Sequence, residues 1–361
     1  MDRMLQTLLL LLVTLTAAVP ALAQPPAPVA TPEAPAPAIR RWLDVQSVHA
    51  GSRFRWYKNS AEELRSSNLQ WQTQLRGRFL FDRAGRYALG TFASTGATFP
   101  SSWNNTGAAL GDYQGPFNIK QLFLSAEPVR GLQFEVGGLH FNRGEMAEHV
   151  TYDNDAYLVG ERVTYRPTKK RISQVSLTAG YFGGSDYNEV NVFKRFERMD
   201  EFNYGQALIG FSLHPRVAAS VDYTYEDGRD IFREGINFRI PSSVKLLTAV
   251  KFEAYQRTTD EDGYGFNLSG DFRYKRYSLT AGVMSVDQFY GSPTRQAFNG
   301  DRYEDGTRQY TIHTLQITPE LQFVIFQTEA FATDFPVNIQ HRFDALMTFN
   351  PTAWLKRKGV F

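Results

Sequence analysis

Apolar and polar side chains alternate along most of this chain. In the stretch 69–81, every second residue from Leu69 to Phe81 is apolar, threonine or glycine, and the residues between them are Gln or Arg apart from Leu80. Successive side chains of a β-strand point to opposite sides, so this pattern predicts a strand with one apolar and one polar face. The same alternation recurs in 48–56, 217–226 and 266–274.

The pattern as a whole predicts sixteen strands. The phase is weaker in 157–166, 231–240 and 320–332 than in the other segments. The sixteen segments are 45–57, 68–82, 86–99, 117–127, 132–142, 157–166, 172–183, 203–213, 216–227, 231–240, 244–256, 264–274, 277–287, 308–317, 320–332 and 337–349.

The connections between these segments alternate in length. Tight turns are expected at 82–85, 128–131, 167–171, 214–216, 241–243, 275–276 and 318–319, and mostly longer polar connections at 58–67, 100–116, 143–156, 184–202, 257–263 and 288–307. The connections near 228–230 and 333–336 break this rule. Short turns at one end and longer loops at the other are typical of a bacterial transmembrane β-barrel.

The predicted fold is therefore all-β: a transmembrane antiparallel β-barrel of about 16 strands, within a range of 14 to 18, with short periplasmic turns and long extracellular loops. A soluble periplasmic sandwich or propeller is the alternative, because alternation also describes a half-buried sheet.

The N-terminus predicts export. Residues 1–23 carry Arg3, an apolar run from Leu8 to Leu15 and the small-residue end Ala21-Leu22-Ala23, the layout of a signal peptide cleaved before Gln24. A membrane anchor is the alternative. Residues 24–41 form a Pro/Ala-rich periplasmic linker, and 42–361 form the predicted barrel.

Composition narrows the class of protein. Lys and Arg number 39 against 37 Asp and Glu, so no charge imbalance indicates nucleic-acid binding. The chain has no cysteine, which excludes disulfide scaffolds, thiolate metal sites and cysteine catalysis. Aromatic residues make up 14% of the chain. No stretch beyond residue 30 approaches the roughly 18 apolar residues of a membrane helix, so the mature protein is either soluble or a membrane barrel.

Five arginines are the candidate pore-lining residues. Arg53, Arg55, Arg76, Arg78 and Arg86 occupy the polar phase of the first three predicted strands. Guanidinium groups stay charged at every working pH and bind carboxylate or phosphate through two hydrogen bonds. We expect a positive wall that favours anions. The alternative is that these arginines only solvate the inner wall.

Three stretches resemble Gram-negative outer-membrane porins and alginate-export-like barrels. They are LRGRFLFDRAGRYALG (75–90), IKQLFLSAEPVRGLQFEVGGL (119–139) and YDNDAYLVGERVTY (152–165). The resemblance implies an outer-membrane location, contact with outer-membrane lipid and the barrel assembly machinery, and a homotrimer. It also suggests a closing strand near the C-terminus. We place that strand at 337–349 and leave 350–361 as a basic tail, with a strand through Trp354 as the alternative.

The connection after the fifth strand, 142–155, carries the acidic residues Glu145, Glu148, Asp153 and Asp155. The resemblance implies that this loop folds into the pore and faces the arginine wall. An outward surface loop and a calcium site built from the same oxygens are the alternatives.

The sequence carries no motif that is typical of an enzyme. The six histidines are scattered, and no glycine-rich phosphate loop follows a strand, so no cofactor or metal is predicted. We expect passive diffusion of small hydrophilic, anionic solutes. A second interpretation is an export barrel for an acidic polysaccharide or oligosaccharide, and a third is an outer-membrane barrel enzyme that modifies lipid.

Overall fold

The computed structural model describes residues 42–96, 102–109, 115, 117–145, 157–168, 171–182, 191–226, 228–241, 243, 246–258, 263–287, 306–332, 336–337 and 339–360. Among these residues, no helix has the length and apolar character that a membrane span requires.

Strands account for most of the described residues. The first half contains β1 (Leu43–Lys58), β2 (Leu64–Leu80), β3 (Tyr87–Thr95), β4 (Asn104–Ala109), β5 (Phe117–Val129), β6 (Leu132–His140), β7 (Tyr157–Tyr165) and β8 (Ile172–Tyr181). The short helix α2 (Val192–Phe196) then precedes β9 (Tyr204–His214), β10 (Val217–Glu226), β11 (Arg229–Arg239), β12 (Leu247–Arg257), β13 (Gly263–Tyr274), β14 (Tyr277–Val286), β15 (Gly306–Gln316), β16 (Leu321–Ala332) and β17 (His341–Phe349), and the helix α4 (Thr352–Arg357) follows them.

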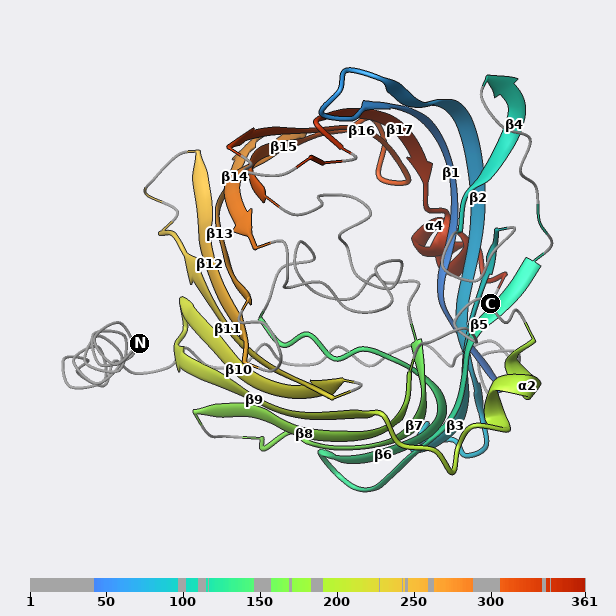
Figure 1. Cartoon of the computed structure of the whole chain (residues 1–361). Coiled ribbons are helices and arrows are strands. Elements are labelled where there is room, and N and C mark those ends of the chain that lie inside the picture. The colour runs from blue at the N-terminus through green and yellow to red at the C-terminus, as the bar shows by residue number, and fades with distance from the viewer. Residues whose placement is uncertain are drawn as a thin grey trace. The chain divides into compact units, whose positions relative to one another are not determined.

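The strands form one closed antiparallel barrel (Figure 1). Closure comes from pairing between the last and first strands, in which Ala345 of β17 lies opposite Phe54 of β1. Strand β4 continues β3 on the same side of β2, because Gln74 of β2 pairs with Ser94 and Trp71 of β2 pairs with Asn104. The seventeen strands therefore occupy sixteen positions around the barrel, which confirms the predicted fold class and strand number.

Strand β4 was not predicted, because its sequence NNTGAA falls inside the expected connection 100–116 and has no apolar alternation. Polar side chains hold it in place instead. The Gln70 Nε2 group donates to Asn105 Oδ1 at 2.7 Å, and the Thr106 hydroxyl donates to the Leu69 carbonyl at 3.0 Å. These contacts depend on β2, so the local pattern of 104–109 could not indicate them.

The two ends of the barrel carry connections of different length, as predicted. At the short-turn end, strands are joined through 81–86, 130–131, 166–171, 215–216, 240–246, 275–276 and 317–320. At the long-connection end, the joins are 59–63, 110–116, 141–156, 182–203, 227–228, 258–262, 287–305 and 333–340. Three joins at the long-connection end, 59–63, 227–228 and 258–262, are shorter than the seven-residue turn 240–246, so the difference between the ends holds for most joins and not for all. The two-residue join at 227–228 does not add a hairpin.

The C-terminal segment leaves the sheet after Phe349, at the short-turn end. This confirms the closing strand and excludes a strand through Trp354, since that residue lies in α4. The helix is tied to the barrel wall at its first residue: the Val48 N–H donates to the Thr352 hydroxyl at 2.8 Å. Closure of the sheet therefore does not require the last residues of the chain.

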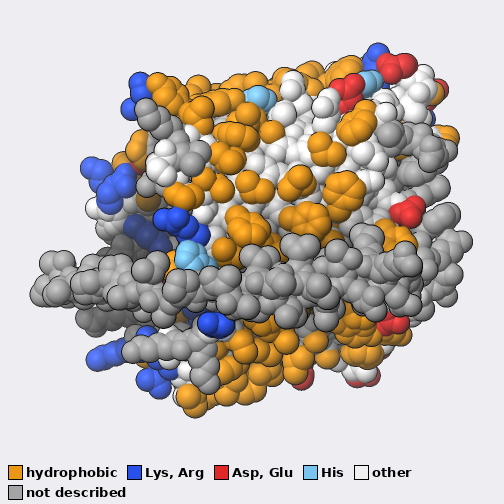
Figure 2. Space-filling model, turned by 90° about the vertical axis from the view of Figure 1, so that its left-hand side faces the viewer, with side chains coloured by type: hydrophobic (Ala, Val, Ile, Leu, Met, Phe, Trp, Pro, Cys, Tyr) orange, Lys and Arg blue, Asp and Glu red, His pale blue; other side chains and the backbone are white. Residues whose placement is uncertain are grey.

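The apolar phase of the strands faces outward. Leu75, Leu124, Leu268 and Val283 are all exposed on the outer surface, and Leu268 keeps 49% of its area accessible. Figure 2 shows the resulting broad apolar wall on one side of the barrel. The opposite phase, exemplified by Gln72, faces inward and is largely buried. The assigned inside and outside of each strand therefore agree with the alternation in the sequence.

Three inward-facing glycines lie side by side where β6, β7 and β8 meet. Gly137 pairs with Gly160, and Gly160 pairs with Gly180. A Cβ atom on Gly160 would stand 2.1 Å from the Ala179 carbonyl oxygen and 2.6 Å from the Gly180 Cα atom. No real Cβ contact is so short, so the close approach of β7 and β8 depends on the missing side chain.

We expect Gly160→Val to destabilise the barrel by about 1–3 kcal/mol, the usual cost of forcing extra atoms into a packed site. The measurement is the temperature at which the folded band is lost on a heat-modifiability gel. Ala179→Val is the matched control, since the Ala179 side chain is exposed. Equal melting temperatures for both variants would contradict the tight contact.

Candidate functional site

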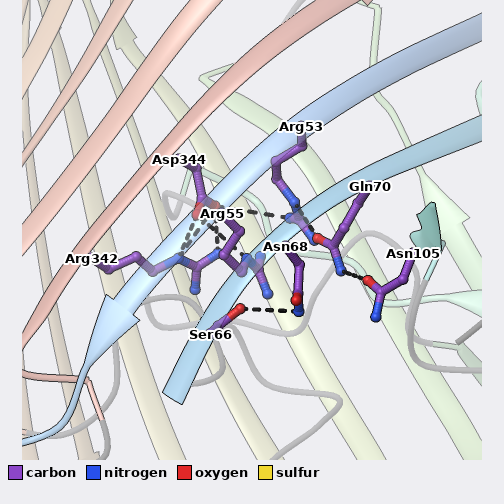
Figure 3. A network of polar contacts seen from close by, with 8 residues as sticks. All are labelled: Arg53, Arg55, Ser66, Asn68, Gln70, Asn105, Arg342 and Asp344. Carbon is purple, nitrogen blue, oxygen red and sulfur yellow. Dashed lines mark hydrogen bonds and ion pairs between the residues drawn. The ribbon is translucent and has the colours of Figure 1, made fainter. Parts of the chain in front are cut away.

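Three guanidinium groups surround one carboxylate on the inner wall where the barrel closes. The Arg342 Nη2 atom lies 2.7 Å from Asp344 Oδ2, and the Arg55 Nε atom lies 3.4 Å from Asp344 Oδ1. The Arg53 Nη1 atom lies 3.9 Å from Asp344 Oδ2. Figure 3 shows these four side chains, here named the Asp344 cluster, converging from β1 and β17.

The Arg53 guanidinium group also contacts neutral side chains besides Asp344. The Nε and Nη2 atoms of Arg53 donate to Gln70 Oε1 at 2.9 and 2.6 Å, and Gln70 donates onward to Asn105 of β4 (Figure 3). The guanidinium carbon also stands 4.1 Å from the centre of the Trp103 ring, a cation–π contact. Trp103 comes directly before β4, so the break between β3 and β4 brings an aromatic ring onto this wall.

The Asp344 cluster concentrates charge on the inner wall. Arg53, Arg342 and Asp344 are 4%, 2% and 3% exposed, so their charges act where screening by solvent is weak. Among the described residues, guanidinium groups from both β1 and β17 contact the Asp344 carboxylate, which ties the two strands together where the barrel closes.

The structure spreads the five predicted arginines along the wall. Arg53 and Arg55 join the Asp344 cluster, whereas Arg76 packs over the Phe92 ring at 4.7 Å. Arg76 lies six residues along β2 from Gln70, the partner of Arg53, which corresponds to about 20 Å at the rise of a strand. The five side chains therefore do not form one patch.

Two of the five arginines lie near the short-turn end. Arg78 donates through Nη2 to the Gly85 carbonyl at 3.2 Å. Arg86 follows that glycine in the turn 81–86 and is exposed. Only Arg53 and Arg55 of the predicted five thus lie beside the break that brings in Trp103.

The connection after β6 starts by turning into the lumen. The Glu145 N–H donates to the Ser220 hydroxyl at 2.7 Å, and the Gln206 amide donates to the Asn142 carbonyl at 2.8 Å. Ser220 and Gln206 are buried residues of the inward phase of β10 and β9, so residues 142–145 reach a wall three and four strand positions away. Glu148, Asp153 and Asp155 lie outside the described residues.

An apolar cluster supports the start of this connection. The Phe141 ring makes edge-to-face contacts with Phe182 and Tyr204, at centroid distances of 5.0 and 5.3 Å. Leu139 and Leu158 complete the packing and are almost fully buried. Edge-to-face ring pairs contribute about 0.5–1.5 kcal/mol beyond the area that they bury, so this cluster helps to hold the start of the connection.

Further ion pairs on the inner wall were not singled out from the sequence. Arg233 forms two hydrogen bonds with Asp222, each of 3.0 Å, and Arg162 lies 3.4 Å from Glu135. Buried ionisable side chains on the described strands comprise seven basic and five acidic residues: Arg53, Lys120, Arg162, Arg233, Arg257, Arg308 and Arg342, and Glu135, Asp222, Glu226, Glu253 and Asp344. All belong to the inward phase.

The inner wall also contains an apolar patch that the sequence analysis did not anticipate. Tyr255, Met284, Tyr310 and Phe326 form one buried cluster. Two of these rings cover glycines on the neighbouring strands, since a Cβ on Gly265 would stand 1.8 Å from the Tyr255 ring. The polar phase therefore includes large side chains where a neighbouring glycine leaves room.

Within the described part of the chain, no group of three or more His, Asp or Glu side chains could hold a metal ion. Of the four acidic residues considered for a calcium site in 142–155, only Glu145 lies in the part of the chain that the structure describes.

Comparison with solved structures supports the fold assignment. A mutant of the Rh. blastica porin matches with a TM-score of 0.53 at 10% identity, over 85% of this chain and 99% of that chain. OmpF of Salmonella typhi, in a complex with daunomycin, matches with a TM-score of 0.56 at 8% identity, over 85% of this chain and 97% of that chain. The fold is thus the sixteen-stranded barrel of the general porins. No protein-family model and no curated protein sequence matches.

We expect Asp344→Asn to destabilise the barrel by about 3–5 kcal/mol, because it leaves buried guanidinium charges without their shared partner. The folded-band melting temperature on a gel reports this loss. Glu62→Gln is the control, because Glu62 pairs with Lys58 at the surface and is 60% exposed, so its substitution should have little effect. A melting temperature unchanged by Asp344→Asn would show that the cluster is fully hydrated.

Proposed function

We propose that this protein is an outer-membrane channel for the passive diffusion of small hydrophilic, anionic solutes. The observation that carries the proposal is the series of arginines on the inner wall of a closed barrel, which runs from the Asp344 cluster to Arg76 and Arg78. Diffusion through such a lumen needs no covalent step and no cofactor.

The outer surface supports a membrane location. A closed barrel leaves no unpaired strand edge, so its backbone groups are satisfied in a lipid environment. The outward phase then provides the apolar band that lipid requires. The signal peptide predicted at 1–23 supports delivery to the outer membrane, and the assembly machinery and the homotrimer remain predictions.

The inner surface supports passage of polar solutes. Gln70 and Gln74 of β2 and Gln133 of β6 lie on the inward phase and are partly accessible, and a polar wall of this kind can replace part of the hydration of a solute. The entry of residues 142–145 into the lumen supports a narrowed path there. Narrowing selects solutes by size, and the charge on the wall selects them by sign.

The proposed preference for anions rests on the accessible guanidinium groups of the inward phase. Asp222 and Glu135 each have a guanidinium partner, so their charges are offset locally. Arg76 and Arg78 lie on the inward phase of β2 and are partly accessible, and a guanidinium group that a solute can reach forms charge-assisted hydrogen bonds with an anion.

Replacing Leu268 with Arg tests the membrane location. Leu268 lies near the middle of β13 between the outward-facing residues Phe252 and Val283. If this surface meets lipid, the substitution should cost about 2–4 kcal/mol, measured by reversible unfolding in lipid bilayers. Gln74→Arg on the inward phase should be tolerated. Equal costs at the two positions would contradict a lipid-facing outer wall.

Neutralising Arg76 and Arg78 tests the anion preference. Both side chains are partly accessible on the inward phase, so Arg76→Gln with Arg78→Gln should leave assembly intact. The single-channel reversal potential in a salt gradient should shift toward cations. The shift should shrink in concentrated salt, because the Debye length falls from about 10 Å at 0.1 M to about 3 Å at 1 M.

The control for this experiment is Arg65→Gln, which removes a basic residue that is exposed and paired with Glu63 at 2.8 Å near the long-connection end. Its reversal potential should stay close to that of the unmodified protein. A reversal potential that does not move in the double variant would contradict the proposed anion preference while leaving a channel in place.

A further inference from the structure

The short turns of the barrel carry a set of exposed basic side chains. Eight described residues in five of the seven short turns are basic and exposed, and none of them forms an ion pair with another described residue. This set, here named the basic rim, consists of Arg83, Arg86, Arg130, Arg166, Arg171, Arg216, Lys275 and Arg276. The five turns extend from the β2–β3 connection to the β13–β14 connection, so the basic rim follows most of the barrel circumference.

Acidic side chains offset little of this charge. The described acidic residues of the short turns are Asp82 and Glu320, and both have partners of their own. Asp82 accepts the Tyr87 N–H at 3.0 Å, and Glu320 pairs with Arg357 of α4 at 2.8 Å. The basic rim therefore keeps a net positive charge at this end of the barrel.

Apolar side chains of the outer wall directly flank the basic rim. The residues that enter or leave four of these five turns are exposed, and five of the seven are aromatic: Phe81, Tyr87, Val129, Tyr165, Ile172, Tyr274 and Tyr277. Aromatic side chains at the ends of barrel strands lie at the level of the lipid headgroups. Figure 2 shows Lys and Arg side chains gathered at one end of the visible face, beside the apolar wall. The basic rim thus lies at the border between that wall and water.

The turn between β13 and β14 shows this arrangement in detail. The Lys275 Nζ atom lies 5.2 Å from the centre of the Tyr274 ring, and Arg276 Nη1 donates to the Ile317 carbonyl at 3.3 Å. Tyr274 and Ile317 are both exposed. The bond to Ile317 is the one hydrogen bond that the Arg276 side chain makes with a described residue, so most of its five N–H donors stay available to another acceptor.

The basic rim and its apolar flanks match the two parts of an anionic phospholipid. A phosphodiester accepts charge-assisted hydrogen bonds from guanidinium and ammonium groups, and acyl chains pack against an apolar wall. A zwitterionic headgroup is a poorer match, because its own ammonium group is repelled by the rim. A soluble anion or an anionic polymer would use the charges alone and would leave the aromatic flanks uncovered.

We propose that the basic rim binds anionic phospholipids, with phosphatidylglycerol as the representative headgroup, in the leaflet that surrounds the short-turn end. The inference rests on the membrane location in the proposed function and adds to it the class of lipid that this end selects. The phosphate lies against the turn arginines and lysine, and the acyl chains lie along the outer wall below the aromatic flanks.

The test compares two spin-labelled lipids, phosphatidylglycerol and phosphatidylcholine, around the full chain refolded in phosphatidylcholine bilayers. Electron paramagnetic resonance separates lipids in contact with the protein from those in the rest of the bilayer. In about 0.1 M salt we expect phosphatidylglycerol to associate about twofold more strongly, because basic residues at the surface attract anionic lipid. In about 1 M salt the ratio should fall toward one, since the Debye length decreases from about 10 Å to about 3 Å.

A variant that removes one basic residue from each of the five turns should lose more than half of this preference. Its substitutions are Arg83→Gln, Arg130→Gln, Arg171→Gln, Arg216→Gln and Lys275→Gln. A matched variant with lysine at the same four arginine positions keeps the charge, so it should keep the preference.

A second control removes basic residues from the opposite end of the barrel. Lys58→Gln with Arg65→Gln takes away two residues that already pair with Glu62 and Glu63, at 3.3 and 2.8 Å. The ratio of the two lipids should stay that of the unmodified protein. Glycerol phosphate, which has the charged headgroup without acyl chains, should not lower the ratio when it is added to the unmodified protein at a concentration that leaves the ionic strength unchanged.

The outcomes separate this inference from the proposed function. Failure of the chain to insert into any bilayer would overturn the membrane location, and the inference with it. Insertion with equal association of the two lipids would overturn the inference alone. A preference that persists in the five-residue Gln variant, or that is lost in the lysine variant, would show that the rim charge is not its cause. Displacement by glycerol phosphate would assign the rim to soluble anions and would also overturn the inference.

Discussion

The hydrogen-bond ladder between β17 and β1 is the interaction on which the rest of the structure depends. A sheet with two free edges would expose rows of unpaired N–H and C=O groups, whereas pairing of the last strand with the first removes both edges. Closure also divides every strand into an inner and an outer phase. The apolar outer wall, the polar lumen and the separation of the two ends all follow from that division.

Closure has a cost on the inner side, because it brings charged groups into a confined space. Pairs such as Arg233 with Asp222 lower this cost by hydrogen bonding both partners at 3.0 Å. The Asp344 cluster does so by placing one carboxylate within 3.9 Å of three guanidinium groups, which links β1 and β17 through side chains as well as through the backbone.

The inner wall is further shaped by breaks in the regular pattern. The interruption between β3 and β4 places Trp103 against Arg53, and the chain after β6 crosses to Ser220 instead of continuing along the barrel wall. The glycine row through Gly160 lets β7 and β8 approach closely beneath the aromatic cluster around Phe141. Each break adds a side chain or a segment to the lumen that sixteen uniform strands would not provide.

The sequence by itself determined the strands, their facing and the end of the barrel at which each connection lies, because alternation with period two is a local property of the backbone. It also indicated Arg53 and Arg55 as inward-facing. Asp344, the carboxylate that both arginines contact, lies about 290 residues away, and the local alternation showed only which phase it occupies. Which side chains meet, and whether β4 exists at all, was decided by the register between strands and by closure, both of which arise from long-range pairing.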